Sequence, residues 1–347
     1  MKVGIVGFRG SGKTTIFNAL TGLSAQTGAH AERRKPHVGV IKVPDQRVET
    51  LGRMLKLKKM SQAEIVFMDF APGKGERALD PNMLEQMKEA DSLAQVVRCF
   101  ADPFSAAPPS PLKEIRDFVA ELMLTDLAVI ENRLARLKKE KDTGHERGLL
   151  ERSKAFIEEE KPLRLLSLSD EDIRGLSGFG FLSQKPLLIL TNLGEEDIGK
   201  PLSDELTDYL TKEGLQAVRL CGKAEMELAE FEEKDRLEFL KEMGLSESAR
   251  DRFVHSSYTL MELISFLTHN EEEVRAWSIR RGTPALKAAG KVHSDMKRGF
   301  IRAEVIHYDD FVRYGSEAKC KEAGRLRLEG KEYVVQDGDI IRFRFSV

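Results

Sequence analysis

Short apolar segments recur along the first two thirds of the chain, with longer segments of mixed character between them. Five of them are almost continuously apolar: Lys2–Gly7, Ala63–Ala71, Ser92–Phe100, Pro186–Asn192 and Ala217–Gly222. Strands that are buried on both faces have this composition. The pattern therefore predicts an α/β fold, in which helices cover both faces of a parallel sheet. Residues 38–45 follow the first predicted helix and could form an antiparallel edge strand.

The periodicity becomes helical between residues 108 and 185. Spacings of three, four and three residues separate Leu127, Ile130, Leu134 and Leu137. This spacing predicts a helix that packs on one neighbour. The charged residues 138–147 indicate a tip, and apolar residues return at 149–157. Ser169–Asp172 is typical of a capping box with Asp in place of Glu. We therefore expect a helical hairpin inserted into the α/β domain.

The pattern changes again at about residue 263. Segments with strand character are Val274–Ile279, Phe300–Ile306, Arg325–Leu328 and Ile340–Phe345. Residues 316–323 have helical character, and Asp337-Gly338 is a turn signal. The pattern predicts a small mixed β-sheet domain with one or two helices.

The length of 347 residues also favours several domains. We expect an α/β domain formed by residues 1–107 and 186–262, an inserted helical domain at 108–185, and a C-terminal domain at 263–347. Hydrophobic residues make up 41% of the chain and charged residues 32%, which is typical of a soluble globular protein. The net charge of -2 excludes a globally basic nucleic-acid binder but allows local patches.

Location and redox state follow from simple features. No apolar stretch approaches the roughly 18 residues that a membrane span needs, and no leader-type cleavage site is visible at the amino terminus. The three cysteines, Cys99, Cys221 and Cys320, are far apart and form no CxxC pair, which favours reduced thiols. We expect a cytoplasmic protein without a membrane segment.

One motif carries specific chemistry. The pattern G-x-x-x-x-G-K-[ST] is matched by Gly7-Phe8-Arg9-Gly10-Ser11-Gly12-Lys13-Thr14, between a predicted strand and a helix at Thr15–Thr21. Glycines allow consecutive backbone N–H groups to point at phosphate oxygens, and the helix N-terminus adds its positive dipole end. Lys13 is expected to neutralise the β- and γ-phosphates, and the Thr14 hydroxyl to coordinate Mg²⁺. The motif predicts nucleoside triphosphate binding.

A second carboxylate is expected on the metal side of such a site. The apolar segment Glu64–Met68 ends in Asp69, which we expect to hold Mg²⁺ through water. With Lys13, Asp69 is the candidate for catalysis. Helix capping by Asp69 is the alternative.

The base is expected to lie near two other strand ends. Asn192-Leu193-Gly194-Glu195 stands where a guanine-reading GTPase has N-K-x-D. Glu195 is longer than Asp by one methylene, and Leu193 replaces the Lys stem that covers the base, so strong guanine specificity is not expected. The second base-contacting loop is expected at Cys221-Gly222-Lys223. A turn-forming Asn is the alternative for Asn192.

These segments, in this order, resemble the Obg-like ATPase family, also called YchF, over nearly the whole chain. The resemblance lies in Val38–Val40, Val43–Asp45, Val97–Phe100, the Asn192/Glu195 spacing, Val274–Trp277, His293–Asp295, Arg298–Val305 and Leu328–Asp339. It implies a Ras-like nucleotide domain, an inserted α-helical coiled coil and a C-terminal TGS domain, which is a ubiquitin-like β-grasp module. It also implies ATP favoured over GTP and association with ribosomes or structured RNA. We expect the protein to be a monomer and to use Mg²⁺.

Two segments depart from the family. Residues 26–36 lack the first-switch motif, and Thr27 is the only hydroxyl candidate there. Residues 71–76 form a shortened second switch. Switch regions sense the γ-phosphate. Because both depart from the family pattern, nucleotide binding is better supported than hydrolysis.

Three functions are compatible with these features. The first is slow ATP hydrolysis coupled to ribosome or RNA association, with no Gln placed to orient the attacking water. The others are a nucleotide-dependent binding module with little hydrolysis, and a conventional GTPase. RNA contact is predicted for the basic residues of the hairpin tip, which are Arg136, Lys138, Lys139, Lys141 and Arg147, and for Arg342 and Arg344 on the last predicted strand. The alternative, which the residues favour without the family resemblance, is a solvated helix end.

Overall fold

A computed structural model describes the chain in two compact units. The described residues are 1–23, 36–70, 79, 81–102, 107–141, 143–232, 235, 236, 238, 240 and 247–346. Residues 26–35 and 71–76, which cover the two expected switch segments and Thr27, lie outside them. The larger unit contains residues 2–39 and 66–256, and the smaller contains Met1 with 40–65 and 257–347.

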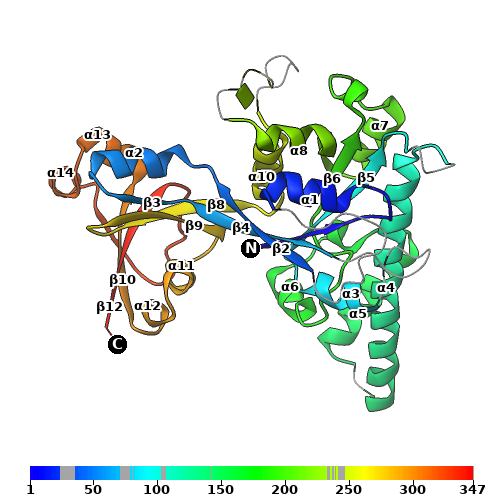
Figure 1. The fold of residues 1–347 in the computed structure, drawn as a ribbon. Coiled ribbons are helices and arrows are strands. Elements are labelled where there is room, and N and C mark those ends of the chain that lie inside the picture. Colours follow the sequence, from blue (N-terminus) through cyan, green and yellow to red (C-terminus); the bar gives the residue numbers. More distant parts are fainter. Residues whose placement is uncertain are drawn as a thin grey trace. The chain divides into compact units, whose positions relative to one another are not determined.

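The sheet that positions the phosphate-binding motif Gly7–Thr14, called the P-loop below, has six strands in the order β2-β4-β1-β5-β6-β7 (Figure 1). Its strands are β1 (Lys2–Val6), β2 (His37–Val43), β4 (Ala63–Asp69), β5 (Ser92–Cys99), β6 (Leu187–Leu193) and β7 (Gln216–Leu220). From β4 to β7 each neighbouring pair is parallel. The predicted parallel α/β fold is therefore confirmed, and β2 is an edge strand.

Helices cover this sheet and extend beyond it. They are α1 (Lys13–Thr21), α3 (Pro81–Lys88), α4 (Pro111–Glu140), α5 (His145–Glu158), α6 (Asp170–Leu176), α7 (Asp204–Lys212), α8 (Gly222–Glu230) and α10 (Ala249–Leu260). One core joins the sheet to α3, α4 and α7, with Leu93, Ile189 and Phe118 fully enclosed. Because the strands are apolar on both faces, the sheet requires cover on both sides.

The predicted hairpin is formed by α4 and α5 (Figure 1). Ile130 and Leu137 are buried between the two helices, and Leu127 and Leu134 pack against the same cluster. Outside this apolar seam, Arg133 donates to both carboxylate oxygens of Glu146, at 2.6 and 3.0 Å. The capping box at Ser169 and Asp172 is present at the start of α6. The leucine spacing thus predicted the hairpin correctly.

The smaller unit is built on a second six-stranded sheet, in the order β11-β10-β12-β8-β9-β3. Its strands are β3 (Lys59–Ser61), β8 (Leu263–His269), β9 (Glu273–Arg280), β10 (Phe300–His307), β11 (Arg327–Glu329) and β12 (Asp339–Phe345). Its helices are α2 (Gln46–Met54), α11 (Ala285–Val292), α12 (Ser294–Arg298), α13 (Tyr308–Tyr314) and α14 (Glu317–Glu322).

Two features of this unit differ from the sequence prediction. One or two helices were expected after residue 263, and the described residues form four, each too short to show a clear helical period. His293 and His307 cap two of them by accepting from the backbone N–H two residues later, a role usually taken by Ser, Thr, Asp or Asn. The strand at 263–269 was not predicted.

The elements α2 and β3 belong to the smaller unit, although we expected residues 46–61 to lie in the α/β domain. β3 pairs with β9 in parallel. Arg47 forms ion pairs with Asp45 at 2.7 Å and with Asp337 at 2.9 Å. Partners 290 residues apart leave no local signal, so only the tertiary structure shows this pairing. The three domain limits given above remain a prediction.

Asp126 fastens α4 to the chain that returns to β6. Its carboxylate is almost fully buried and accepts from the backbone N–H groups of Leu182 at 2.8 Å and Ser183 at 2.7 Å. Burial raises the pKa of Asp126 to about 6, against the lowering effect of these hydrogen bonds. Folded Asp126 therefore keeps its proton to a higher pH than in the unfolded chain, where the pKa of Asp is about 3.9.

We expect this raised pKa to make stability depend on pH. Between about pH 4 and 6 the folded state binds a proton at Asp126 that the unfolded state has released. The contribution of Asp126 to the free energy of unfolding is therefore full below that range and is lost as the pH rises through 6. Its limiting slope is about 1.4 kcal/mol per pH unit. Urea unfolding at a series of pH values across this range measures the free energy of unfolding. That free energy should fall less steeply with pH for Asp126→Asn than for the wild type. Equal slopes would contradict the assignment.

Candidate functional site

The loop between β1 and α1 is curled by its glycines. Gly7 has φ +143° and Gly12 has φ +89°, in the region that side chains rarely adopt. A Cβ at Gly7 would lie 2.4 Å from the Val96 carbonyl oxygen, and one at Gly12 would lie 2.3 Å from Asn192 Nδ2. Both positions therefore require glycine. Arg9 and Gly10 are exposed at the crest of the loop, whereas Ser11 is buried.

Lys13 lies beneath this loop. Its side chain is nearly buried, and Nζ donates to the carbonyl oxygens of Gly7 at 2.6 Å and Phe8 at 2.9 Å. Burial lowers the pKa of Lys13 to about 8, and the negative charges of Asp69 and Glu114 oppose that shift. The ammonium group is thus still cationic at pH 7, and it is held at the loop where phosphates are expected.

Thr14 and Asp69 meet beside the loop. Thr14 Oγ1 donates to Asp69 Oδ2 at 3.1 Å. β1 and β4 are parallel neighbours, so the helix after β1 and the carboxyl end of β4 lie at the same sheet edge. A hydroxyl and a carboxylate are oxygen ligands of the kind Mg²⁺ takes. Among the described residues no group of three or more His, Cys, Asp or Glu could hold a metal.

Asn192 joins the P-loop to the next loop of the sheet edge. Its Nδ2 donates to the Ser11 carbonyl at 2.9 Å, and its Oδ1 accepts from the Gly222 N–H at 3.0 Å. The side chain is only 5% exposed. Both ends of the amide therefore contact backbone, so in this structure Asn192 positions the loops around the site.

The other base-side residues also gather here. Leu193 and Cys221 are buried, and Cys221 precedes the first residue of α8. A Cβ at Gly222 would lie 3.4 Å from Thr15 Cγ2, so the first turns of α1 and α8 are in close contact. Lys223 Nζ forms a solvent-exposed ion pair with Glu195 Oε1 at 3.0 Å. The Glu195 carboxylate is thus paired within the protein.

Glu114 is a residue near the site that the sequence did not indicate. It lies in the first turn of α4, and its carboxylate accepts from the Arg98 N–H at 3.2 Å. Its backbone carbonyl accepts from Gln95 Nε2 at 3.0 Å. Burial raises the pKa of Glu114, partly against the charge of Lys13. The residues around Glu114 in the sequence do not indicate its contact with β5, because only the fold brings the start of α4 to that strand.

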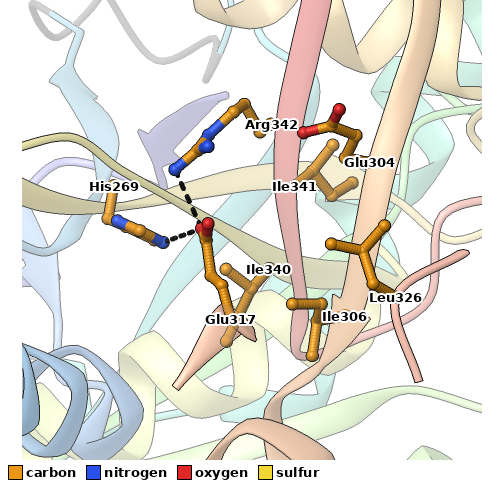
Figure 2. Close-up of a pocket in the computed structure, with 8 residues that line it drawn as sticks. All are labelled: His269, Glu304, Ile306, Glu317, Leu326, Ile340, Ile341 and Arg342. Carbon is orange, nitrogen blue, oxygen red and sulfur yellow. Dashed lines mark hydrogen bonds and ion pairs between the residues drawn. The ribbon is translucent and has the colours of Figure 1, made fainter. Parts of the chain in front are cut away.

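The predicted basic surfaces differ in how their charges are paired. Figure 2 shows Arg342 and His269 both reaching Glu317, each at 2.9 Å, in a small cavity of the C-terminal unit. Arg344 forms two 2.9 Å hydrogen bonds with Glu304. These arginines are largely neutralised by partners in the same unit, which weakens the prediction that they contact RNA.

The hairpin tip is different. Its exposed cations are Arg136, Lys138, Lys139 and Lys141. Within the described part of the chain, none of these four side chains has a hydrogen bond or ion pair. Arg147, by contrast, pairs with Glu151 at 2.8 Å. The tip thus presents four cations to solvent, with the exposed carboxylate of Glu140 among them.

A search of the described helices finds none that is long and apolar enough to cross a membrane. The three cysteines are free thiols, with Cys221 and Cys320 buried.

Comparisons with known proteins agree with this site. Residues 2–133 match a family model described as 50S ribosome-binding GTPase, and residues 263–346 match the YchF-GTPase C-terminal model, described as a protein of unknown function. The chain is 36% identical over 365 residues to the ribosome-binding ATPase YchF of Bacillus subtilis, and the match covers 100% of both chains. It is 35% identical to the protein of that name from Escherichia coli O157:H7, covering 100% of this chain and 99% of the relative.

Solved structures give the same result. The YchF GTPase of Schizosaccharomyces pombe matches with a TM-score of 0.87 and 27% identity, over 99% of this chain and 97% of that one. A GTP-binding protein from Pyrococcus horikoshii matches with a TM-score of 0.62 and 18% identity over the whole of both chains, which supports the fold alone.

The bridging amide of Asn192 leads to a prediction. Asn192→Ala removes both hydrogen bonds and frees the P-loop from Gly222, so we expect ATP and GTP to lose affinity equally, by about thirtyfold, for two hydrogen bonds of about 1 kcal/mol each. Calorimetric titration with each nucleotide measures this. A loss confined to one base would instead assign Asn192 to base reading. Ser203→Ala, which removes the cap of α7 away from the loop, is the matched control.

Proposed function

This chain belongs to the YchF family, and from this premise we propose that it binds ATP with Mg²⁺, hydrolyses it slowly and associates with ribosomes. The observation that supports nucleotide chemistry most directly is the arrangement of Lys13 beneath a glycine-shaped loop, with Thr14 hydrogen-bonded to Asp69. Ribosome association is taken from the names of the relatives and from the charge of the hairpin tip.

Each residue of the phosphate site has a proposed role. The backbone N–H groups of the loop from Gly7 to Thr15 bind phosphate oxygens, and the N-terminus of α1 adds its dipole. Lys13, now held by two carbonyl oxygens, turns its ammonium group to the β- and γ-phosphates. It thereby stabilises the charge on the transferred phosphoryl group. No covalent nucleophile is required, since positioning and charge stabilisation account for catalysis of this type.

Thr14 and Asp69 fit a magnesium site. We propose that Thr14 ligates the ion directly and that Asp69 holds it through water. When bound, Mg²⁺ neutralises phosphate charge. The 3.1 Å distance between Thr14 Oγ1 and Asp69 Oδ2 means that the two oxygens converge on one place.

Adenine is the preferred base in this proposal. A guanine-reading loop needs a carboxylate that accepts two N–H groups, and the Glu195 carboxylate already pairs with Lys223. Leu193 is buried at the end of β6 and offers no Lys stem to cover the base. GTP is the competing substrate, because the S. pombe relative is named a GTPase.

Nucleotide titrations and turnover assays test this proposal. At matched Mg²⁺ we expect tighter binding of ATP than of GTP, and ATP turnover well below the 1–100 s⁻¹ typical of kinases. Glu195→Asp together with Leu193→Lys should shift the preference toward GTP. Tenfold tighter binding of GTP by the wild type would refute the adenine preference. Binding without turnover would favour the nucleotide-dependent binding module.

Lys13→Ala is the negative control for both assays. It removes a charge-assisted contact but little core packing, so the fold should persist while triphosphate affinity is lost. An unchanged ATP affinity would contradict the P-loop assignment.

The hairpin tip is the proposed ribosomal contact. Four cations on one helix end, which have no ion pair among the described residues, suit a phosphate backbone, whose binding is dominated by electrostatics. α4 has 30 residues, which corresponds to about 45 Å at 1.5 Å per residue. Because Glu114 near Lys13 lies in its first turn, the tip lies at the other end of the same helix. Charge changes at the tip should therefore leave the nucleotide site unaffected.

We predict that Lys138→Gln, Lys139→Gln and Lys141→Gln together weaken co-sedimentation with ribosomes and flatten its salt dependence. Each lost phosphate contact should reduce the log–log salt slope by roughly 0.7–0.9. The matched control neutralises Lys113, Lys161 and Lys200, exposed lysines that already pair with carboxylates. Co-sedimentation that survives the tip substitutions with an unchanged slope would show that the tip is merely solvated.

A further inference from the structure

A groove lies beside the tip, between α4, α5 and the chain that follows α6. We call it the hairpin groove, and its lining includes Arg133, Glu146, Leu149, Gly175, Gly178 and Phe179. The floor is apolar and the rim is charged. Neither the phosphate site nor the family resemblance uses these residues.

The groove contains a fixed aromatic ring. Phe179 stacks on Phe181 with ring centroids 5.2 Å apart and planes only 4° from parallel. Phe181 is buried, so it holds the orientation of Phe179, which is itself half-exposed. A ring held in this way can stack a flat ligand with little loss of side-chain entropy.

Two glycines keep the groove accessible. A Cβ at Gly178 would meet no atom within 4 Å, and one at Gly175 would meet only Leu149 Cδ2, at 3.3 Å. Neither glycine has a positive φ. Their lack of side chains is therefore not required by the backbone, and it leaves space next to Phe179.

The rim supplies hydrogen-bonding groups of both kinds. Arg133 and Glu146 form a two-bond pair across the hairpin. His145 lies next to them and contacts Asp172 at 3.2 Å, and Arg152 also reaches Asp172, at 2.9 Å. Donors and acceptors beside an apolar floor suit the edge of a heterocyclic base rather than an aliphatic chain.

The positive charge beside the groove indicates that the base belongs to a nucleic acid. Arg136 lies one turn beyond Arg133 on the same face of α4, and Lys138, Lys139 and Lys141 continue the positive charge to the tip. A polyanion with accessible bases matches this combination. In duplex RNA the bases are stacked, so the match is to unpaired nucleotides, which proteins bind by stacking on aromatic rings.

We propose that the hairpin groove binds one unstacked base of single-stranded RNA, stacked on Phe179, while the tip cations bind the neighbouring phosphates. This inference rests on the proposed ribosome association and adds a binding site to it. The specificity it predicts is for unpaired over duplex RNA, since only an unpaired base can enter.

Fluorescence anisotropy with the full chain tests this site, using a short labelled oligouridylate and an RNA duplex of equal length. Phe179→Leu keeps apolar volume on Phe181 but removes the stacking face, and it should weaken oligouridylate binding about tenfold. Phe179→Tyr should retain wild-type affinity. Gly178→Leu, at a position with open space, should block the groove and also weaken binding. None of these changes should alter the salt slope or the affinity for duplex.

Several outcomes would overturn the inference. They are unchanged oligouridylate affinity in both Phe179→Leu and Gly178→Leu, equal losses for oligouridylate and duplex, or no wild-type binding of oligouridylate. Circular dichroism and ATP affinity confirm that each variant is folded. If the tip lysines matter for ribosome co-sedimentation but the groove variants bind oligouridylate normally, the inference alone fails. If the tip substitutions leave co-sedimentation unchanged, the proposed ribosomal contact fails, whatever the groove variants show.

Discussion

The arrangement of the site depends on one buried amide. Asn192 holds the Ser11 carbonyl with one end and the Gly222 N–H with the other, so a single side chain joins the P-loop to the start of α8. A Cβ at Gly12 would collide with it. The P-loop conformation, the place of Thr14 and the approach of the base-side loops therefore share one constraint. A polar group so buried is stable only because both of its ends are satisfied.

A second connection runs from the same site into the hairpin. Glu114 fastens the first turn of α4 to the end of β5, and Asp126 fastens the middle of the helix to Leu182 and Ser183. Apolar packing with α5 then supports the rest. A helix held at several points along its length is a stiff element. The tip cations and the hairpin groove are consequently carried in a defined position relative to the phosphate site, within the same unit.

The sequence alone predicted the features that depend on neighbouring residues. Apolar segments predicted the parallel strands, the leucine spacing predicted the hairpin, and the motif from Gly7 to Thr14 predicted the strand, loop and helix that the structure contains. It predicted too few helices after residue 263, because short helices such as Ser294–Arg298 complete hardly more than one turn. It missed Glu114 and the pairing of Arg47 with Asp337, because these contacts join residues distant in the chain.

What the sequence determined by itself is therefore the chemistry and the elements: a phosphate-binding loop, a carboxylate at a strand end, a helical hairpin and a basic tip. Tertiary structure decided which charges remain available. Arg342 and Arg344 are neutralised by Glu317 and Glu304, whereas the described tip lysines have no such partners. Tertiary structure also brings Asn192 between the Ser11 carbonyl and the Gly222 N–H, so that its side chain joins the P-loop to the start of α8. The physical reason is that helix and strand periods are local, whereas the pairing of a buried amide or a surface charge depends on groups that only the folded chain brings within hydrogen-bonding distance.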